Sequence, residues 1–304
     1  MKPALFAFPH ISSYPVLLLL GFFFGWLLAR SRRRWFGVDG RHIDNISLIL
    51  SIAGLVGARF FARLFYEKVP VFEAIQVWKG DGLVFYGGLA LSVAAVFAYG
   101  WVRRVNLVRF ADCLAPSVAL GLAFGRVGCF LAGCCWGDVC VSTAQLAAID
   151  EPAVLARIHT IPAISSSAWP GAVTFPARSD IAKQHVKLGL LAAGSERSLP
   201  VHPVQLYEAG LAAGLCVLLH LASRGKVPPG LTSIALLLGY ACIRFGTEFL
   251  RADNRIYAGE FTFSQVVSLW IAAFCVLLLA ARKVRRRVPV PEAAAPYTPH
   301  PASG

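Results

Sequence analysis

Charged side chains inside strongly apolar stretches are the residues of this sequence most suited to chemistry. Arg126 lies in the glycine-rich run Gly125–Gly137, and Arg244 and Glu248 lie one helical turn apart in another apolar run. A charge at the centre of a bilayer costs about 2.5–3.5 kcal/mol on insertion scales, so such groups are usually paired and functional. Arg126 has no acidic residue near it in the sequence, which favours an anionic ligand. Arg244 and Glu248 share a helix face and are spaced to form an ion pair.

Polar groups also open two other apolar runs. The stretch His202–Glu208 places an imidazole, an amide, a phenol and a carboxylate within two turns, which exceeds what a helix cap requires. The stretch Phe85–Gly88 pairs Tyr86 with two glycines, a pattern typical of an interfacial aromatic beside close helix packing or a bound headgroup. Arg59 and Arg63 share one face of a further apolar run, where snorkelling to an interface is the alternative to ligand binding.

The composition shows what kind of element must position these groups. The chain has 304 residues, of which 57% are hydrophobic and only 15% charged, with a mean hydropathy of +0.63. Soluble domains carry about 25% charged residues, so the composition argues against a soluble enzyme and against a disordered chain. Eight cysteines in 304 residues are too few for a disulfide-built scaffold.

We predict an all-α, polytopic membrane protein. A spanning helix needs about 20 mostly apolar residues, and seven segments come close to that length. The fourth segment contains Arg126, so we expect it to break or tilt. The segments are Tyr14–Ala29, Ile46–Tyr66, Leu83–Trp101, Ala111–Cys135, Leu206–Ala222, Leu231–Leu250 and Phe263–Ala281.

Basic residues predict the orientation. Arginine and lysine clusters follow the first, third, fifth and seventh segments, which places all of them on one side of the membrane. The positive-inside rule makes that side cytoplasmic, with the N-terminus outside and the C-terminus in the cytoplasm. The formal net charge of +13 is therefore mainly a topology signal, and no nucleic-acid partner is expected. Four arginines follow the first segment instead of preceding it, so we interpret it as a retained anchor.

The connecting segments complete the predicted organisation. Residues 1–287 form the transmembrane domain, with an extracytoplasmic loop or cap at about 136–203. Residues 288–304 are proline-rich and are predicted to be a disordered cytoplasmic tail. We expect a monomer in the membrane.

We expect several of the candidate residues to lie in the outer halves of these helices. Arg126, Arg244, His202 and Tyr86 all belong to those halves or can reach them. Several arginines converging there predict a phosphate ligand, because a guanidinium binds phosphate through a bidentate fork. The phosphate available at that depth is a phospholipid headgroup, so the residues predict a protein that holds an anionic lipid of the outer leaflet.

Four of the cysteines cluster in the sequence. Cys129, Cys134, Cys135 and Cys140 fall on the predicted oxidising side, whereas the other four stand in apolar contexts and resemble small buried hydrophobes. A disulfide from Cys134 or Cys135 to Cys140 is open, as is a redox or nucleophilic role. No metal is expected, because no nearby histidine completes a familiar zinc spacing.

These motifs together resemble a known family, the prolipoprotein diacylglyceryl transferases. The resemblance runs from about Ser12 to Gln265 and includes five motifs in the right order. They are Gly57-Ala58-Arg59, Phe85-Tyr86-Gly87-Gly88, Gly125-Arg126 through Gly137, His202-Pro203-Val204-Gln205-Leu206-Tyr207-Glu208, and Arg244 through Glu248-Phe249 to Arg251.

The resemblance implies an activity and its partners. Family enzymes move a diacylglyceryl group from phosphatidylglycerol to the thiol of a lipobox cysteine in a preprolipoprotein, without a metal or cofactor, in the bacterial cytoplasmic (inner) membrane. It implies that Arg126 and Arg244 stabilise the departing phosphate, that Glu248 orients Arg244, and that Gly87 and Gly88 let the lipid approach the backbone. The candidate catalytic residues are Arg126, Arg244, Tyr86, His202 and Glu248. The candidate substrate-binding residues are Arg59, Gly87, Gly88, Gly125, Gly137, Gln205, Tyr207, Glu208 and Arg251.

The sequence departs from the family pattern at several polar positions. Tyr86 replaces a family histidine that is a candidate base, and Cys129, Ala132 and Cys134 occupy positions that are usually polar in the family. A phenol with a pKa of about 10 is a poor base, so we expect His202 to take the proton. The alternatives are a non-catalytic lipid- or anion-binding protein, such as an accessory factor or transporter, and a thiol-redox membrane protein.

Overall fold

The computed structural model describes residues 13–76, 78, 84–140, 171–187, 190–192, 194–224, 227–252, 257–258 and 261–287. Apart from one two-stranded antiparallel hairpin, the regular elements of this part are helices, as predicted. The elements are α1 (Ser13–Phe36), α2 (Gly40–Phe65), α3 (Val71–Ala74), α4 (Phe85–Arg103), α5 (Leu107–Ala132), α8 (Asp180–Lys187), α9 (Val204–Ala222), α10 (Leu231–Glu248), β1 (Tyr257–Ala258), β2 (Phe261–Thr262) and α11 (Phe263–Arg287).

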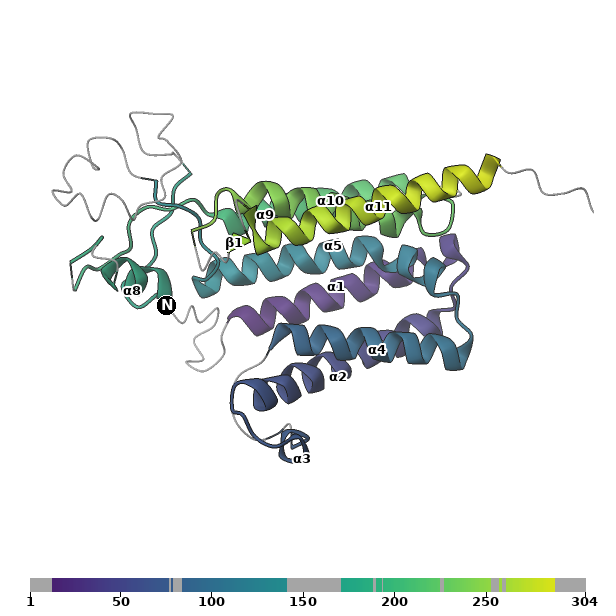
Figure 1. Ribbon diagram of the computed structural model, residues 1–304, viewed down its shortest axis with the longest axis horizontal. Coiled ribbons are helices and arrows are strands. Elements are labelled where there is room, and N and C mark those ends of the chain that lie inside the picture. Colours follow the sequence, from purple (N-terminus) through teal and green to yellow (C-terminus); the bar gives the residue numbers. More distant parts are fainter. Residues whose placement is uncertain are drawn as a thin grey trace, which may run out of the picture.

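The long helices lie side by side in one elongated bundle (Figure 1). Helices α1 and α5 form its middle, α9, α10 and α11 lie on one side, and α2 and α4 lie on the other. Helix α5 packs against α1, α9 and α10, while α4 packs against α2. The central position of α5 places Arg126, near its end, among three other helices.

Five of these helices are long and apolar enough to cross a membrane, judged by length and composition within the described residues. They are α1, α2, α5, α9 and α11, which correspond to five of the seven predicted segments. The remaining two segments correspond to α4 and α10, and α10 carries Arg244 and Glu248 in its last turns. The many large hydrophobic side chains exposed on the bundle, such as Leu19, Leu55 and Phe97, suit a lipid environment.

Helix directions gather the basic clusters at one end of the bundle. The C-terminal ends of α1, α4, α9 and α11 point the same way, and each is followed by or contains arginine or lysine (Figure 1). The opposite end carries α8, the hairpin and the connection that follows α5. The odd-segment pattern of charges thus matches the arrangement of the helices.

Helix α5 is continuous through Arg126, contrary to the expected break. It begins at an Asn106 cap, whose side chain accepts a hydrogen bond from the Arg109 amide at 3.2 Å. It ends at Gly133, which adopts a left-handed conformation with φ +73° that glycine favours. Pro116 inside the helix and the glycines around Arg126 do not interrupt it, because α1 and α9 pack along its length.

The predicted cap at 136–203 is only partly within the described residues. Trp136, Phe175, Ile181 and Val201 form a small hydrophobic cluster there, and the short helix α8 packs into it through Ile181. This cluster gives the described part of the cap its own core beside the bundle end. The predicted tail at 288–304 lies outside the described residues.

Candidate active site

The segment that follows α5 forms a strap across the ends of two other helices. We call Trp136–Cys140 the strap. Its Gly137 amide donates to the His202 carbonyl at 3.0 Å, and its Asp138 amide donates to the Leu250 carbonyl at 2.8 Å. The Ala252 amide donates back to the Trp136 carbonyl at 3.3 Å. The strap therefore ties the end of α5 to the entry of α9 and the exit of α10.

Gly137 leaves no room for a side chain in the strap. A Cβ atom there would lie 2.6 Å from the His202 carbonyl oxygen and 2.7 Å from the His202 Cβ, well inside contact distance. Its predicted substrate-binding role thus has a packing role beside it, since this glycine lets the strap lie against His202.

We expect Gly137→Ala to loosen the strap and destabilise the protein by about 1–3 kcal/mol, the usual cost of overpacking. Thermal unfolding in detergent measures the effect. Gly121→Ala is the matched control, because a Cβ atom at Gly121 would meet nothing within 4 Å. Equal unfolding temperatures for the two variants would contradict the strap's role.

A buried ion network lies at the same end of the bundle. Glu208 of α9 is 1% exposed and pairs with both Arg126 of α5 and Arg244 of α10, the latter at 2.8 Å. Arg244 also pairs with Glu248 at 2.6 Å, as the four-residue spacing predicts. Two guanidinium groups and two carboxylates thus share one small volume between three helices.

Uncharged donors complete the network. The Thr247 hydroxyl donates to Glu208 at 2.7 Å, and Arg244 donates to the Ser264 hydroxyl of α11 at 3.1 Å. The Tyr240 phenol interacts with Arg126. These three residues were not predicted from the sequence. The available signal was the helical spacing of Tyr240, Arg244 and Thr247 on one side of α10.

The network gives Arg126 and Glu208 partners that the sequence did not reveal. Arg126 has no acid nearby in the sequence, but in the fold it pairs with Glu208, far along the chain. Glu208, a candidate substrate-binding residue, has described contacts with Arg126, Arg244 and Thr247. Both arginines are therefore ion-paired within the protein, although the side chains of Arg126 and Arg244 remain 17% and 15% exposed.

The start of α9 lies beside the network and the strap. Gln205 is 1% exposed and donates to the Cys134 carbonyl at 2.7 Å, which fixes the chain just after α5. The His202 and Tyr207 rings meet edge to face, with centroids 6.3 Å apart. Burial lowers the pKa of the His202 imidazole, so it stays neutral at a lower pH than an exposed histidine. Three polar side chains predicted from this motif, those of His202, Gln205 and Tyr207, thus lie at the start of α9.

The Tyr86 motif has a different location. It begins α4, which lies on the far side of α1 and α5 from α9 and α10 (Figure 1). A Cβ atom on Gly87 would meet Phe61 and the Gly57 backbone, and one on Gly88 would lie 2.6 Å from the Gly54 carbonyl. Both glycines therefore allow close packing of α4 on α2, and their predicted role in lipid approach stays a prediction. Tyr86 itself is 71% exposed.

The remaining candidate residues lie on α5, after α10 and on α2. A Cβ atom on Gly125 would meet nothing within 4 Å, so there is open space beside this residue. Arg251 follows α10 and its backbone bridges Gly137 of the strap. Arg59 lies partly buried in α2, and its neighbour Arg63 is buried and pairs with Glu67 at 3.1 Å.

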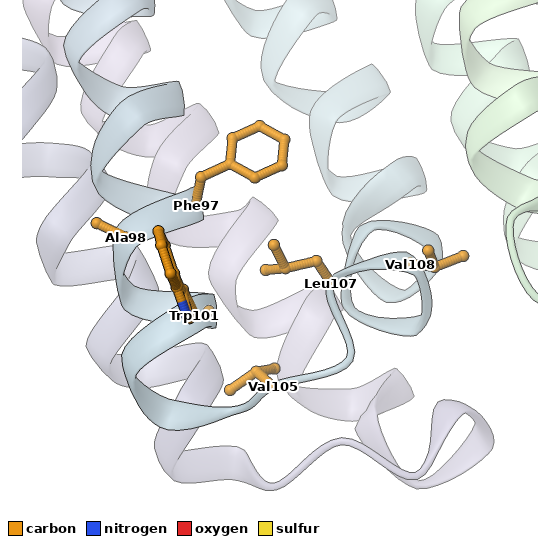
Figure 2. Close-up of a pocket in the computed structure, with 7 residues that line it drawn as sticks. Phe97, Ala98, Trp101, Val105, Leu107 and Val108 are labelled. Carbon is orange, nitrogen blue, oxygen red and sulfur yellow. The ribbon is translucent and has the colours of Figure 1, made fainter.

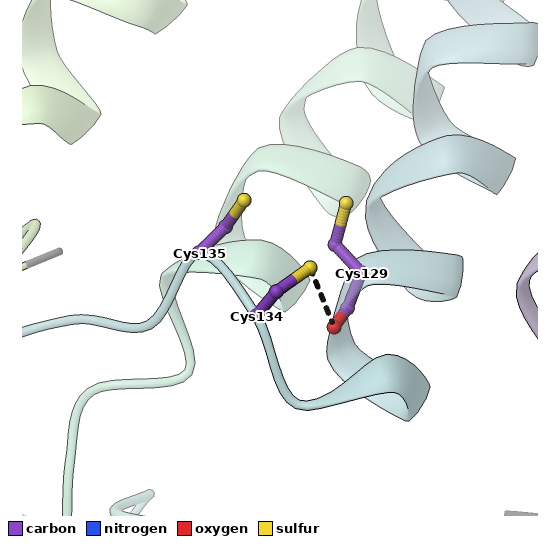
Figure 3. Close-up of side chains that lie close together, drawn as sticks. All are labelled: Cys129, Cys134 and Cys135. Atoms are coloured by element: carbon purple, nitrogen blue, oxygen red, sulfur yellow. Dashed lines mark hydrogen bonds between the residues drawn. The ribbon is translucent and has the colours of Figure 1, made fainter. Parts of the chain in front are cut away.

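Three of the clustered cysteines converge at the end of α5 (Figure 3). The sulfur atoms of Cys129, Cys134 and Cys135 all lie within 4.8 Å of one another. Cys140 instead continues the strap, with its thiol directed at the Asp138 carbonyl, and burial raises its pKa to about 12. All eight cysteines are free, so the disulfide to Cys140 that the sequence left open is not formed here.

An apolar hollow lies at the opposite end of the bundle. Figure 2 shows it between the end of α4 and the start of α5, lined by Phe97, Trp101, Leu107 and their neighbours. Its lining contains no charged side chain. It lacks the groups that a phosphate would need, and we assign the functional site to the network and strap.

Comparisons with known proteins identify the family of this chain. The prolipoprotein diacylglyceryl transferase family model matches residues 3–281. The phosphatidylglycerol–prolipoprotein diacylglyceryl transferase of Methylococcus capsulatus is 29% identical over 285 residues, which cover 90% of this chain and 91% of the relative. Proteins of the same name from Burkholderia pseudomallei and Burkholderia thailandensis are each 30% identical over 270 residues, or 85% of both chains. The chain belongs to the prolipoprotein diacylglyceryl transferase family.

Proposed function

We propose that this protein transfers a diacylglyceryl group from phosphatidylglycerol to the thiol of a lipobox cysteine in preprolipoproteins. The single observation that carries the proposal is the buried cluster of Arg126, Arg244 and Glu208, in a chain of this family. These residues lie near the end of α5, the start of α9 and the end of α10, which are at the bundle end opposite the basic helix ends (Figure 1). An outer-leaflet headgroup would be met at that end.

The arginines act on the leaving phosphate. A guanidinium has five N–H donors, and Arg126 meets Glu208 through Nε, which leaves its terminal nitrogens for Tyr240 and a phosphate oxygen. Arg244 is held by Glu208, Glu248 and Ser264. Such fixed donors stabilise charge that develops in the transition state without reorganising at the moment of reaction. Glu208 and Glu248 are therefore positioning residues for the two arginines.

The transfer itself forms a carbon–sulfur bond and breaks a carbon–oxygen bond. A base takes the proton of the lipobox thiol, the thiolate attacks the glyceryl carbon, and glycerol phosphate leaves with the electron pair. His202 is the proposed base, because its lowered pKa keeps the imidazole neutral and it lies at the strap beside α9. Tyr86 is a weaker candidate because of its exposure and its location on α4. Arg59, Gly125, Tyr207 and Arg251 are proposed to contact the substrates, and the buried Gln205 is proposed to support them by holding the chain after α5.

We expect His202→Ala to slow transfer by about 100-fold or more, the usual contribution of a general base. In the unsubstituted protein, transfer should fall only as the pH drops below about 6.5, because protonation of His202 removes the base and its pKa lies below the ordinary value. Rates measured with a lipobox peptide from pH 5 to 8 test both statements. His220→Ala, at the other end of α9, is the control. Full transfer by His202→Ala would exclude this role.

The same proposal covers the membrane arrangement. We propose that α4 and α10 cross the bilayer together with the five apolar helices, giving seven spans with the N-terminus outside and the C-terminus cytoplasmic. The shared end of the basic clusters supports this orientation through the positive-inside rule. The proposed location is the bacterial cytoplasmic membrane, and the protein is proposed to act as a monomer.

Complementation tests the function directly. The gene is expressed in a bacterium depleted of its own transferase, and lipidation of a reporter preprolipoprotein is followed by its shift in mobility and by mass spectrometry. We expect growth and a diacylglyceryl thioether on the reporter. Purified protein that retains phosphatidylglycerol but leaves the reporter unmodified would instead identify the lipid-binding accessory alternative.

A further inference from the structure

The thiols of Cys129, Cys134 and Cys135 form a cluster that the proposed transfer does not use. Cys129 lies on the last turn of α5, and Cys134 and Cys135 follow the left-handed Gly133. Cys135 has a positive φ of 59°, uncommon for a residue with a side chain, and this turn aims its thiol back toward the helix (Figure 3). The Cys134 thiol lies 3.6 Å from the Cys129 carbonyl oxygen.

We propose that these three cysteines form a binding site for a monovalent copper ion. Their sulfur atoms lie within 4.8 Å of one another. With metal–sulfur bonds of about 2.3 Å, three sulfurs around one ion lie about 4 Å apart, so small side-chain rotations suffice. The sequence spacing argued against zinc, but it does not show that the turn at Gly133 brings all three thiols together.

The three sulfur ligands determine which metal ion the site would favour. Thiolates are soft ligands that favour monovalent copper, zinc and iron–sulfur clusters. Structural zinc takes four ligands, and within the described residues the group of potential ligands consists of these three cysteines alone. Monovalent copper is satisfied by three thiolates, so it fits the set without a fourth residue.

Positive charge near the three cysteines would stabilise a negatively charged copper–thiolate group. Three thiolates around one monovalent cation carry a net charge of −2, which needs compensation where water is scarce. Cys135 lies within the electrostatic reach of both Arg126 and Arg251. The charge of Arg126 is already paired with Glu208, so Arg251 offsets part of the excess negative charge of the copper–thiolate group.

Copper binding by the reduced, full-length protein in detergent tests the proposal. Monovalent copper is supplied as its complex with the chromogenic chelator bathocuproine disulfonate, and transfer to the protein is followed by the loss of colour. We expect one ion per chain and an X-ray absorption spectrum with three sulfur neighbours at about 2.3 Å. No transfer from the chelator, or a shell with fewer sulfurs, would overturn the proposal.

Substitutions locate the site. Cys129→Ser and Cys135→Ser should each weaken copper binding by more than about 100-fold, since losing even a supporting neighbour of a ligand costs 10–100-fold. Cys140→Ser, on the strap but outside the trio, and Cys242→Ser should bind copper as the unsubstituted protein does. Size-exclusion profiles confirm that each variant is folded. Undiminished binding in both trio variants would contradict the assignment, as would a disulfide within the trio that persists in reductant. Because the readout is copper retention, a failed copper test leaves the transferase proposal intact.

Discussion

Replacing either network arginine with alanine should lower diacylglyceryl transfer by at least about 100-fold, in the range observed when one transition-state donor is removed. Arg126 and Arg244 approach the same carboxylate from different helices, so neither can take over the donors of the other. Transfer from phosphatidylglycerol vesicles to a lipobox peptide, normalised to inserted protein, measures the effect. Lysine variants should recover little, because an ammonium cannot form the bidentate contact with phosphate.

The control is an arginine at the other end of the bundle. Arg30 pairs with Asp44 at the far end of α1, and its side chain is substantially exposed. We expect Arg30→Ala to transfer within about twofold of the unsubstituted protein, since exposed pairs contribute about 0–1 kcal/mol. If Arg126→Ala or Arg244→Ala were equally active, the phosphate contact proposed for that residue would have to be abandoned.

Glu208→Gln should be the most destabilising single change in the network. It removes the carboxylate shared by Arg126, Arg244 and Thr247, and breaking a buried ion pair from one side costs about 3–5 kcal/mol. Glu248→Gln should cost less, because Arg244 keeps its pair with Glu208. Thermal unfolding of both variants in the same detergent provides the comparison.

Phosphatidylglycerol adds a second readout to this comparison. If its phosphate binds the arginines, the lipid should raise the unfolding temperature of Glu208→Gln more than that of the unsubstituted protein, because the phosphate replaces the missing carboxylate. Equal stability of the Glu208 and Glu248 variants would contradict the shared-carboxylate arrangement. An equal lipid effect on Glu208→Gln and the unsubstituted protein would contradict phosphate binding at these arginines.

Patterns over short stretches of sequence predicted the helices and the ion pair within one helix. Hydropathy located the long helices, and the four-residue spacing predicted the pair of Arg244 and Glu248. The pairing of Arg126 with Glu208 was not predictable in this way, because it depends on how α5 packs against α9. A single sequence contains no direct signal for such a contact.

Glycine and cysteine patterns were ambiguous for the same reason. Gly87 and Gly88 were compatible with a bound headgroup or with close packing, and only the location of α2 reveals the packing contacts. The three thiols come together through the left-handed turn at Gly133, a backbone conformation that spacing alone does not reveal. Sequence reasoning therefore identified the polar residues better than their partners.

The shared carboxylate has a consequence for biogenesis. If the helices enter the bilayer in chain order during translation, α5 arrives before α9, and Arg126 then has no Glu208 to neutralise it. The nascent chain would hold an uncompensated arginine in lipid until the α9–α10 hairpin is inserted, at which point three charges become paired together. Chains truncated before α9 keep Arg126 unpaired and should therefore be preferred targets of membrane quality-control proteases. In the completed bundle Arg126 is paired with Glu208, so it no longer marks the chain for degradation.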